Sequence, residues 1–94
     1  SVNTPELRME FAEGEHYAFM EKLKEVAEFP NGEVSTIDGL RVDYDEGFGL
    51  IRPSNTTPIL VIRFEADSES AIEAIQNDFR AAVHKVDANQ PTPF

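Results

Sequence analysis

An apolar stretch between Pro58 and Ala66 constrains the fold of this chain more than any other segment. It opens with Ile59-Leu60-Val61-Ile62, four apolar residues in a row. A short continuous apolar run of this kind is typical of a strand that has neighbours on both sides and lies buried. We therefore expect residues 58–66 to form a central strand of a sheet, with both of its faces covered.

The segments before this run indicate further strands joined by tight turns. They span residues 7–11, 33–37, 40–44 and 48–52. In residues 40–44, apolar and polar residues alternate, which is the period of a half-buried strand. Asp38-Gly39 is a strong hairpin signal, and Asp45-Glu46-Gly47 turns the chain again. Because short turns join strands that lie side by side, the four strands between residues 33 and 66 predict an antiparallel meander.

Two amphipathic helices are expected, one before the meander and one after it. Glu15 to Phe29 carries its apolar residues at helical spacing, and the helix stops at Pro30-Asn31-Gly32. The second helix runs to Val86 and begins at Asp67 or Ser68, since either residue suits the N-cap position. Each helix needs a sheet on which to bury its apolar stripe. The predicted fold is therefore α+β, an antiparallel sheet flanked by two helices in the order β-α-β-β-β-β-α.

The turn between the last two strands has the composition of an anion-binding site. It contains Arg52, Ser54, Asn55, Thr56 and Thr57, with a proline near each end. An Arg guanidinium fits phosphate or carboxylate oxygens with two parallel donors, and hydroxyls rotate to suit an acceptor. A tight turn can also point successive backbone N–H groups into one concavity. The alternative is a polar turn whose hydroxyls only cap their own backbone. Arg52 favours the anion site, most of all for phosphate.

Composition excludes several other functions. The 94 residues suffice for one small domain, and they include no cysteine and carry a net charge of −10. This excess of acidic residues opposes binding to nucleic acid. No apolar run is long enough to span a membrane, and no secretion signal is evident. We therefore expect a cytoplasmic protein that binds neither nucleic acid nor membrane. The two histidines lack metal-ligand spacing and the carboxylates form no recognisable pair, so we expect no metal site and no catalytic residue here.

Three consecutive strand and loop segments together resemble a known family. They read Asp38-Gly39-Leu40-Arg41-Val42-Asp43-Tyr44, then Gly47-Phe48-Gly49-Leu50-Ile51-Arg52-Pro53-Ser54-Asn55-Thr56-Thr57-Pro58, then Leu60-Val61-Ile62-Arg63-Phe64-Glu65-Ala66. They are similar to the C-terminal domain of the bacterial phosphomannomutase/phosphoglucomutase family, within the α-D-phosphohexomutase superfamily. The resemblance covers nearly the whole chain. It implies a hinge or linker to upstream domains at 1–5, the C-terminal domain at 6–87 and a tail at 88–94. The family's domain has a fold like that of the TATA-box-binding protein.

The resemblance implies a role in an enzyme, with the chemistry located in other domains. Members convert a hexose 6-phosphate to the 1-phosphate, with glucose or mannose as the sugar, through a bisphosphorylated intermediate. The loop would hold the phosphate that is not being transferred, through Arg52, Ser54, Asn55 and Thr56, with Thr57 in support. A phosphoserine, Mg²⁺ and the residues that read the sugar would belong to the other domains. The partners implied are a phosphosugar and the remaining domains of the same chain, and these 94 residues alone would be inactive.

Two other classes of function remain open at this point. A sheet of this size with two helices could be a freestanding regulatory domain that binds a small ligand. The acidic surface could instead be the contact face of a protein-interaction module.

Overall fold

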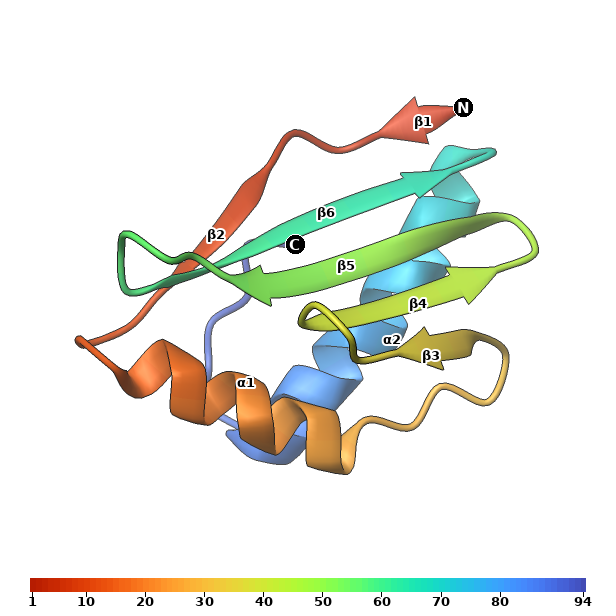
Figure 1. Cartoon of the computed structure of the whole chain (residues 1–94). Helices are drawn as coiled ribbons and strands as arrows, with labels where there is room; N and C mark the ends of the chain where they lie inside the picture. Colours follow the sequence, from red (N-terminus) through yellow and green to blue (C-terminus); the bar gives the residue numbers. More distant parts are fainter.

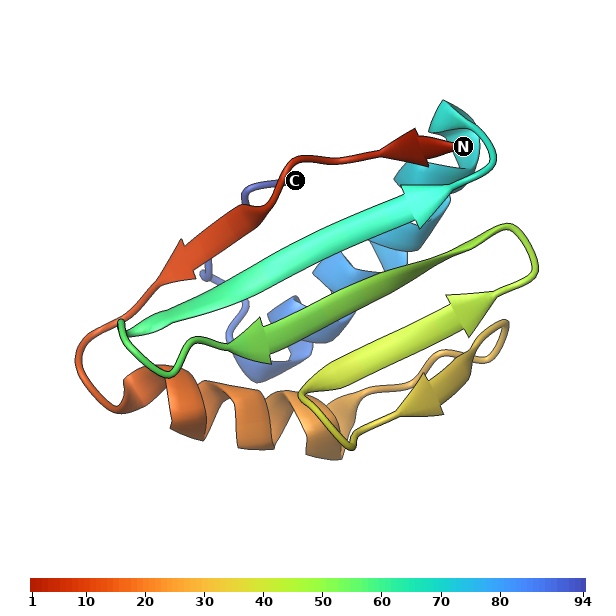
Figure 2. The ribbon, with the colours of Figure 1, turned by 45° about the horizontal axis from the view of Figure 1, so that its top comes forward.

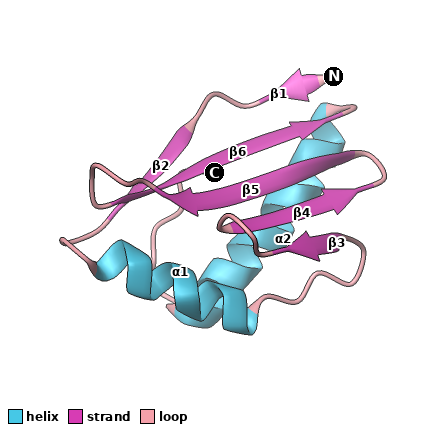
Figure 3. Cartoon of the chain, in the orientation of Figure 1, coloured by secondary structure: helices cyan, strands magenta, loops and turns pink.

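The computed structural model describes residues 1–94 and contains six strands and two helices, shown by type in Figure 3. The strands are β1 (Val2–Asn3), β2 (Leu7–Glu10), β3 (Glu33–Ser35), β4 (Leu40–Tyr44), β5 (Gly47–Pro53) and β6 (Ile59–Ala66). The helices are α1 (Glu15–Val26) and α2 (Glu69–Val86). The predicted α+β class is confirmed, and the short strand β1 precedes the predicted series of elements.

All strand pairs are antiparallel, and the sheet runs in the order β1-β6-β5-β4-β3. Strand β2 pairs with β6 along the same edge as β1. Between β1 and β2, the Thr4 N–H donates to the Phe64 carbonyl at 3.0 Å, and the Phe64 N–H donates to Thr4 Oγ1 at 3.1 Å. The first five residues, predicted to link this domain to others, thus lie along β6 in this structure.

Both helices pack on the same face of the sheet, and the opposite face is open (Figure 1). The burial of β6 alternates accordingly. Leu60 and Ile62 are 0% exposed beneath the helices, whereas Ile59 and Val61 point to the open face and are only half-buried. The predicted central position of this strand is confirmed, since β5 lies on one side of it and β1 and β2 on the other. The prediction that both faces are covered is wrong, because no element of this chain packs on the second face.

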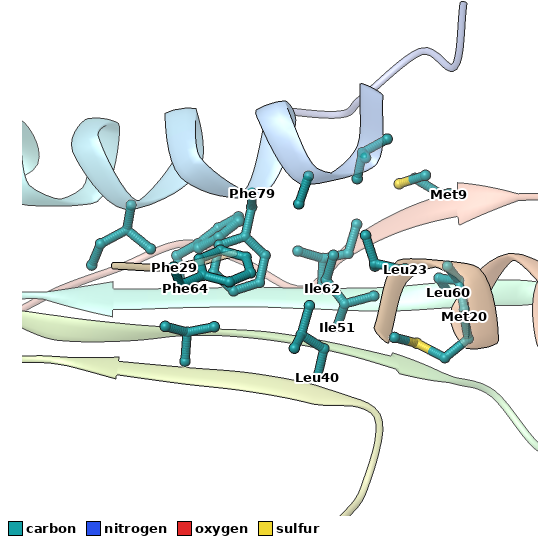
Figure 4. Packing of buried hydrophobic residues seen from close by; sticks show 14 of the residues in the cluster. Met9, Met20, Leu23, Phe29, Leu40, Ile51, Leu60, Ile62, Phe64 and Phe79 are labelled. Carbon is teal, nitrogen blue, oxygen red and sulfur yellow. The ribbon is translucent and has the colours of Figure 1, made fainter. Parts of the chain in front are cut away.

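The core lies between the sheet and both helices, and aromatic rings pack together beneath α2 (Figure 4). Phe79 of α2 contacts Phe64 of β6 edge-on at 5.3 Å between ring centroids, and it lies 5.0 Å from Phe29. Gly49 of β5 lies beneath the Phe79 ring, where a Cβ atom would approach the ring carbons to 2.5 and 2.7 Å. Glycine in β5 therefore lets α2 approach the sheet closely.

Local backbone and side-chain geometry explains where α2 begins and where α1 ends. The Ser68 Oγ accepts a hydrogen bond from the Ala71 N–H at 3.1 Å, so Ser68, and not Asp67, caps α2. Helix α1 ends at Val26, earlier than predicted, because Ala27 adopts an extended conformation. The chain then turns inward and buries Phe29. Neither helix combines the length and the apolar character that crossing a membrane would require.

The C-terminal tail is attached to the core at its last residue. The Phe94 ring meets Phe64 edge-on at 5.1 Å between centroids, and the Arg80 Nε–H donates to the main-chain oxygen of Phe94 at 3.1 Å. Residues 88–94 correspond to the tail that the resemblance implied. It contains no helix or strand, but its terminal ring packs against the domain.

Candidate functional site

The loop between β5 and β6 forms the tip of the longest hairpin and lies at the same end of the sheet as the connection from β2 to α1 (Figure 2). Two backbone hydrogen bonds close it. The Ser54 N–H donates to the Ile59 carbonyl at 3.0 Å, and the Ile59 N–H donates to the Thr57 carbonyl at 2.8 Å. The strands continue into the loop without a break, so its polar groups are held on a rigid hairpin end.

Within the loop, several donors converge on the hydroxyl oxygen of Ser54. This oxygen accepts from the Thr57 hydroxyl at 3.1 Å, from the Thr56 N–H at 3.3 Å and from the Thr57 N–H at 3.4 Å. The Thr56 hydroxyl lies 3.3 Å from it. The two N–H contacts are longer than the usual 2.9–3.0 Å. The loop therefore brings backbone and hydroxyl donors together around the Ser54 hydroxyl oxygen, with which the backbone donors form only weak hydrogen bonds.

Arg52 stands beside these donors on the open face of β5. It pairs across the sheet with Val61, its side chain is exposed, and it takes part in none of the ion pairs of the chain. Arg41, on the neighbouring strand, is engaged. Its guanidinium donates to Asp43 at 2.9–3.2 Å and lies 4.1 Å above the Phe48 ring. The hydrogen bond to Asp43 raises the pKa of Arg41. Arg52 is thus available to a ligand, whereas Arg41 is held by its neighbours.

A tight contact with the turn between β3 and β4 supports the backbone at Arg52. Gly39 in that turn has a positive φ of 78° and lies against β5. A Cβ atom on Gly39 would collide with the carbonyl oxygen of Ile51 and would come within 2.8 Å of the Cα and Cβ atoms of Arg52. Glycine here satisfies the turn conformation and also allows this close approach.

One hollow of about 370 Å³ brings the predicted site residues together. It is lined by Arg52, Ser54, Asn55, Thr56 and Thr57, and also by Glu6, Arg8, Ile59 and Val61. The five residues singled out from the sequence therefore share one concavity. Two of the other lining residues are charged groups from β2 and the segment before it. Their contribution depends on how β2 pairs with β6, which the sequence did not reveal.

The start of α1 forms a second wall next to the loop. A smaller hollow of about 280 Å³ lies between Glu13, Gly14, His16 and Tyr17 on one side and Asn55, Thr56 and Thr57 on the other. The Tyr17 hydroxyl is oriented toward the Ser54 carbonyl, to which it donates at 3.4 Å. The Tyr17 ring lies against buried His16, with 4.0 Å between ring centroids and an angle of 35° between the ring planes. No local sequence pattern indicates this position of Tyr17.

The arrangement presents positive charge and several hydrogen-bond donors to the same hollow. It offers a free guanidinium, backbone N–H groups and hydroxyls, all donors that suit phosphate oxygens. No three His, Asp or Glu side chains of the chain are grouped so that they could hold a metal ion. The donors in the hollow have the chemistry that recognition of a negatively charged group requires.

Known proteins are similar to this chain over most of its length. A family model described as "Phosphoglucomutase/phosphomannomutase, C-terminal domain" matches residues 6–82. Over 93 residues, 99% of its length, the chain is 45% identical to a phosphomannomutase/phosphoglucomutase of Pseudomonas aeruginosa. It is 54% identical over 85 residues, 88% of its length, to a phosphoglucomutase of Neisseria gonorrhoeae.

A solved structure is similar along the whole chain. The crystal structure of a phosphoglucomutase/phosphomannomutase family protein from Burkholderia thailandensis covers 100% of the chain with a TM-score of 0.89 and 46% identity. The chain spans 20%, 18% and 19% of the Pseudomonas, Neisseria and Burkholderia proteins, respectively. It is therefore similar to about a fifth of each of these longer proteins.

Proposed function

Because the chain belongs to the phosphoglucomutase/phosphomannomutase family and corresponds to its C-terminal domain, we propose that the β5–β6 loop binds the phosphate group of a hexose phosphate. The observation that carries this proposal is the hollow in which the unpaired Arg52 faces the donors gathered around Ser54. In an acidic chain with a net charge of −10, a guanidinium without a carboxylate partner supports a role in binding an anion.

Binding would use the loop largely as it is folded. A phosphate oxygen placed near the Ser54 hydroxyl would accept the hydrogen bonds that the Thr56 and Thr57 N–H groups now make weakly to Ser54. The Ser54 hydroxyl, freed as an acceptor, could then donate to the same phosphate. Arg52 would contribute two parallel donors and a positive charge from the open face of the sheet. Asn55 lies exposed at the tip, where its amide can reach a ligand oxygen.

In the complete enzyme, phosphate binding by this loop would contribute to the interconversion of hexose 6-phosphate and hexose 1-phosphate, with glucose or mannose as the sugar. A bisphosphorylated intermediate must present either phosphate to the reacting group, and a site that recognises the phosphate itself serves both orientations. Holding one phosphate fixes the distance and direction of the other, which supplies catalysis through positioning. Closure of the domain over the sugar would exclude water.

The chemical step would take place in other domains. Their phosphoserine would exchange the phosphoryl group, and Mg²⁺ would neutralise the charge that develops on it. We propose that the residues that hold this ion also lie in those other domains. The catalytic contribution of this chain is then confined to binding and orientation.

The proposal is tested by the substitution Arg52→Ala in the full-length enzyme. A charge-assisted hydrogen bond contributes about 1.5–3 kcal/mol, so kcat/KM for glucose 1-phosphate should fall by about 10- to 100-fold. Arg41→Ala is the control, because Arg41 lies on the same face but is engaged by Asp43 and Phe48. Its effect should be milder. Unchanged kinetics of Arg52→Ala with both glucose and mannose phosphates would rule out the proposed phosphate contact.

A further inference from the structure

A second arginine lies on the same face of the sheet as Arg52 and opens into the same hollow. In the strand register, Val61 of β6 pairs with Arg52 of β5 on one side and with Arg8 of β2 on the other. Directly paired residues of a sheet point to the same face, so the two arginines flank Val61. Neighbouring strands lie about 4.8 Å apart, which puts the two Cα atoms about 10 Å from each other. Two long side chains can meet over Val61 at that distance.

Arg8 is as free of partners as Arg52. The ion pairs of the chain engage Lys24, Arg41 and Lys85, and Arg8 makes no side-chain hydrogen bond. Glu6 and Glu10, two positions away on either side, do not come within 4.0 Å of its nitrogens. Of these two residues, Glu6 lines the hollow and Glu10 does not.

Two unpaired guanidinium groups facing one hollow repel each other, and an anion between them removes that cost. A phosphate monoester carries a charge of about −1.5 to −2 at neutral pH and has three acceptor oxygens, enough for donors on both sides. A sulfate monoester carries a single negative charge, so a second guanidinium is of less use to it. The pair of arginines is therefore suited to a doubly charged group.

We propose that Arg8 is a further ligand of the phosphate that Arg52 and the Ser54–Thr57 loop bind, and that the two arginines together select a doubly charged phosphate ester. This inference rests on the function proposed above and adds a residue to that site. The loop would hold the phosphate at the end of the sheet, and Arg8 would contact it from the edge strand opposite Arg52.

The test compares Arg8→Gln, Arg8→Lys and Lys22→Gln in the full-length protein. Arg8→Gln should lower kcat/KM for glucose 1-phosphate by about tenfold. Arg8→Lys should recover part of the loss, because it keeps the charge but not the fork of donors. Lys22→Gln changes the net charge equally from an exposed position on α1 and should have no effect. The thermal midpoint of all three variants should stay close to that of the wild type, because the side chains of Arg8 and Lys22 are both exposed.

A direct readout comes from titrating the 94-residue chain with glucose 6-phosphate while recording the arginine Nε–H resonances. The signals of Arg8 and Arg52 should shift with one common dissociation constant. The signal of Arg80 should not shift, because its guanidinium is held by Asn77 and Phe94. In a parallel titration with glucose 6-sulfate, Arg8→Gln should weaken binding less than it does for the phosphate.

The outcomes separate the two proposals. If Arg52→Ala impairs the enzyme while Arg8→Gln leaves kcat/KM unchanged and the Arg8 signal does not move, the role of Arg8 is refuted and the phosphate site stands. If neither substitution has an effect, the phosphate site fails and the role of Arg8 fails with it. Equal losses of phosphate and sulfate binding in Arg8→Gln would refute the selection of a doubly charged group.

Discussion

Replacing Ser54 by alanine distinguishes a loop that binds phosphate from a polar turn whose hydroxyls only form hydrogen bonds within the turn. A hydroxyl that caps nearby backbone N–H groups contributes about 0.5–2 kcal/mol to stability. In this loop the N–H contacts to Ser54 Oγ are long, at 3.3 and 3.4 Å, and the donors belong to the exposed residues Thr56 and Thr57. Water can replace the Ser54 hydroxyl as the acceptor for these N–H groups. The loss of folding stability should therefore lie near the lower end of this range, at about 0.5 kcal/mol. For a domain of this size, that lowers the melting temperature by about 2–4 °C.

The expected effect of Ser54→Ala on binding is larger than its effect on stability. A hydrogen bond to a charged group is worth about 1.5 kcal/mol or more, which corresponds to a loss of affinity of about tenfold. Phosphate affinity is measured by calorimetric titration with inorganic phosphate, and the melting temperature of the same protein is measured by thermal denaturation. Ser70→Ala serves as a control, because it removes an exposed hydroxyl at the start of α2, away from the hollow. Unchanged phosphate affinity together with a fall of about 10 °C or more in melting temperature would show that Ser54 has only a structural role.

Two further predictions concern the fold that positions the site. Gly49→Ala places a methyl group against the Phe79 ring and should destabilise the domain by about 1–3 kcal/mol; a denaturation midpoint equal to that of the wild type would show that α2 can move away freely. Tyr44 donates to Asp78 Oδ2 at 2.9 Å, and burial, followed by this hydrogen bond, raises the pKa of its hydroxyl above the ordinary value of about 10. The raised pKa contributes stability that is fully present below about pH 10 and is lost as the pH rises further toward the folded-state pKa. Chemical denaturation at several pH values should therefore show a steeper loss above pH 10 in the wild type than in Tyr44→Phe, and parallel curves would contradict this.

Alternation of residue types and turn signals made most of the sheet predictable. Strand β4 follows a period-two pattern and Asp45-Glu46 turns the chain directly into β5, so the pairing of these two strands could be read from local residues. Strand β1 could not be found in this way. It consists of two residues, and its place depends on pairing with β6 and on Thr4. The expectation that residues 59–62 are covered on both faces failed because a continuous apolar run does not reveal how many layers pack on a sheet.

The candidate site was predictable only where it is continuous in sequence. Arg52 and the Ser54–Thr57 segment are neighbours along the chain, so their composition pointed to an anion site directly. Arg8 lies far away in the sequence, and its alternation with Leu7 and Met9 indicated only that it faces away from the core. The register of β2 on β6 is what places it opposite Arg52. The part played by Tyr17 likewise depends on α1 beginning beside the loop.

The most direct test of the phosphate site is a crystal structure of the full-length enzyme bound to glucose 1,6-bisphosphate. One phosphate should lie within about 2.7–3.2 Å of the Arg52 guanidinium and of donors in the Ser54–Thr57 loop. The contacts of Thr56 and Thr57 to the Ser54 hydroxyl should then be replaced by contacts to that phosphate. A complex in which both phosphates bind elsewhere, and the Ser54 hydroxyl still accepts from Thr56 and Thr57, would contradict the proposed function.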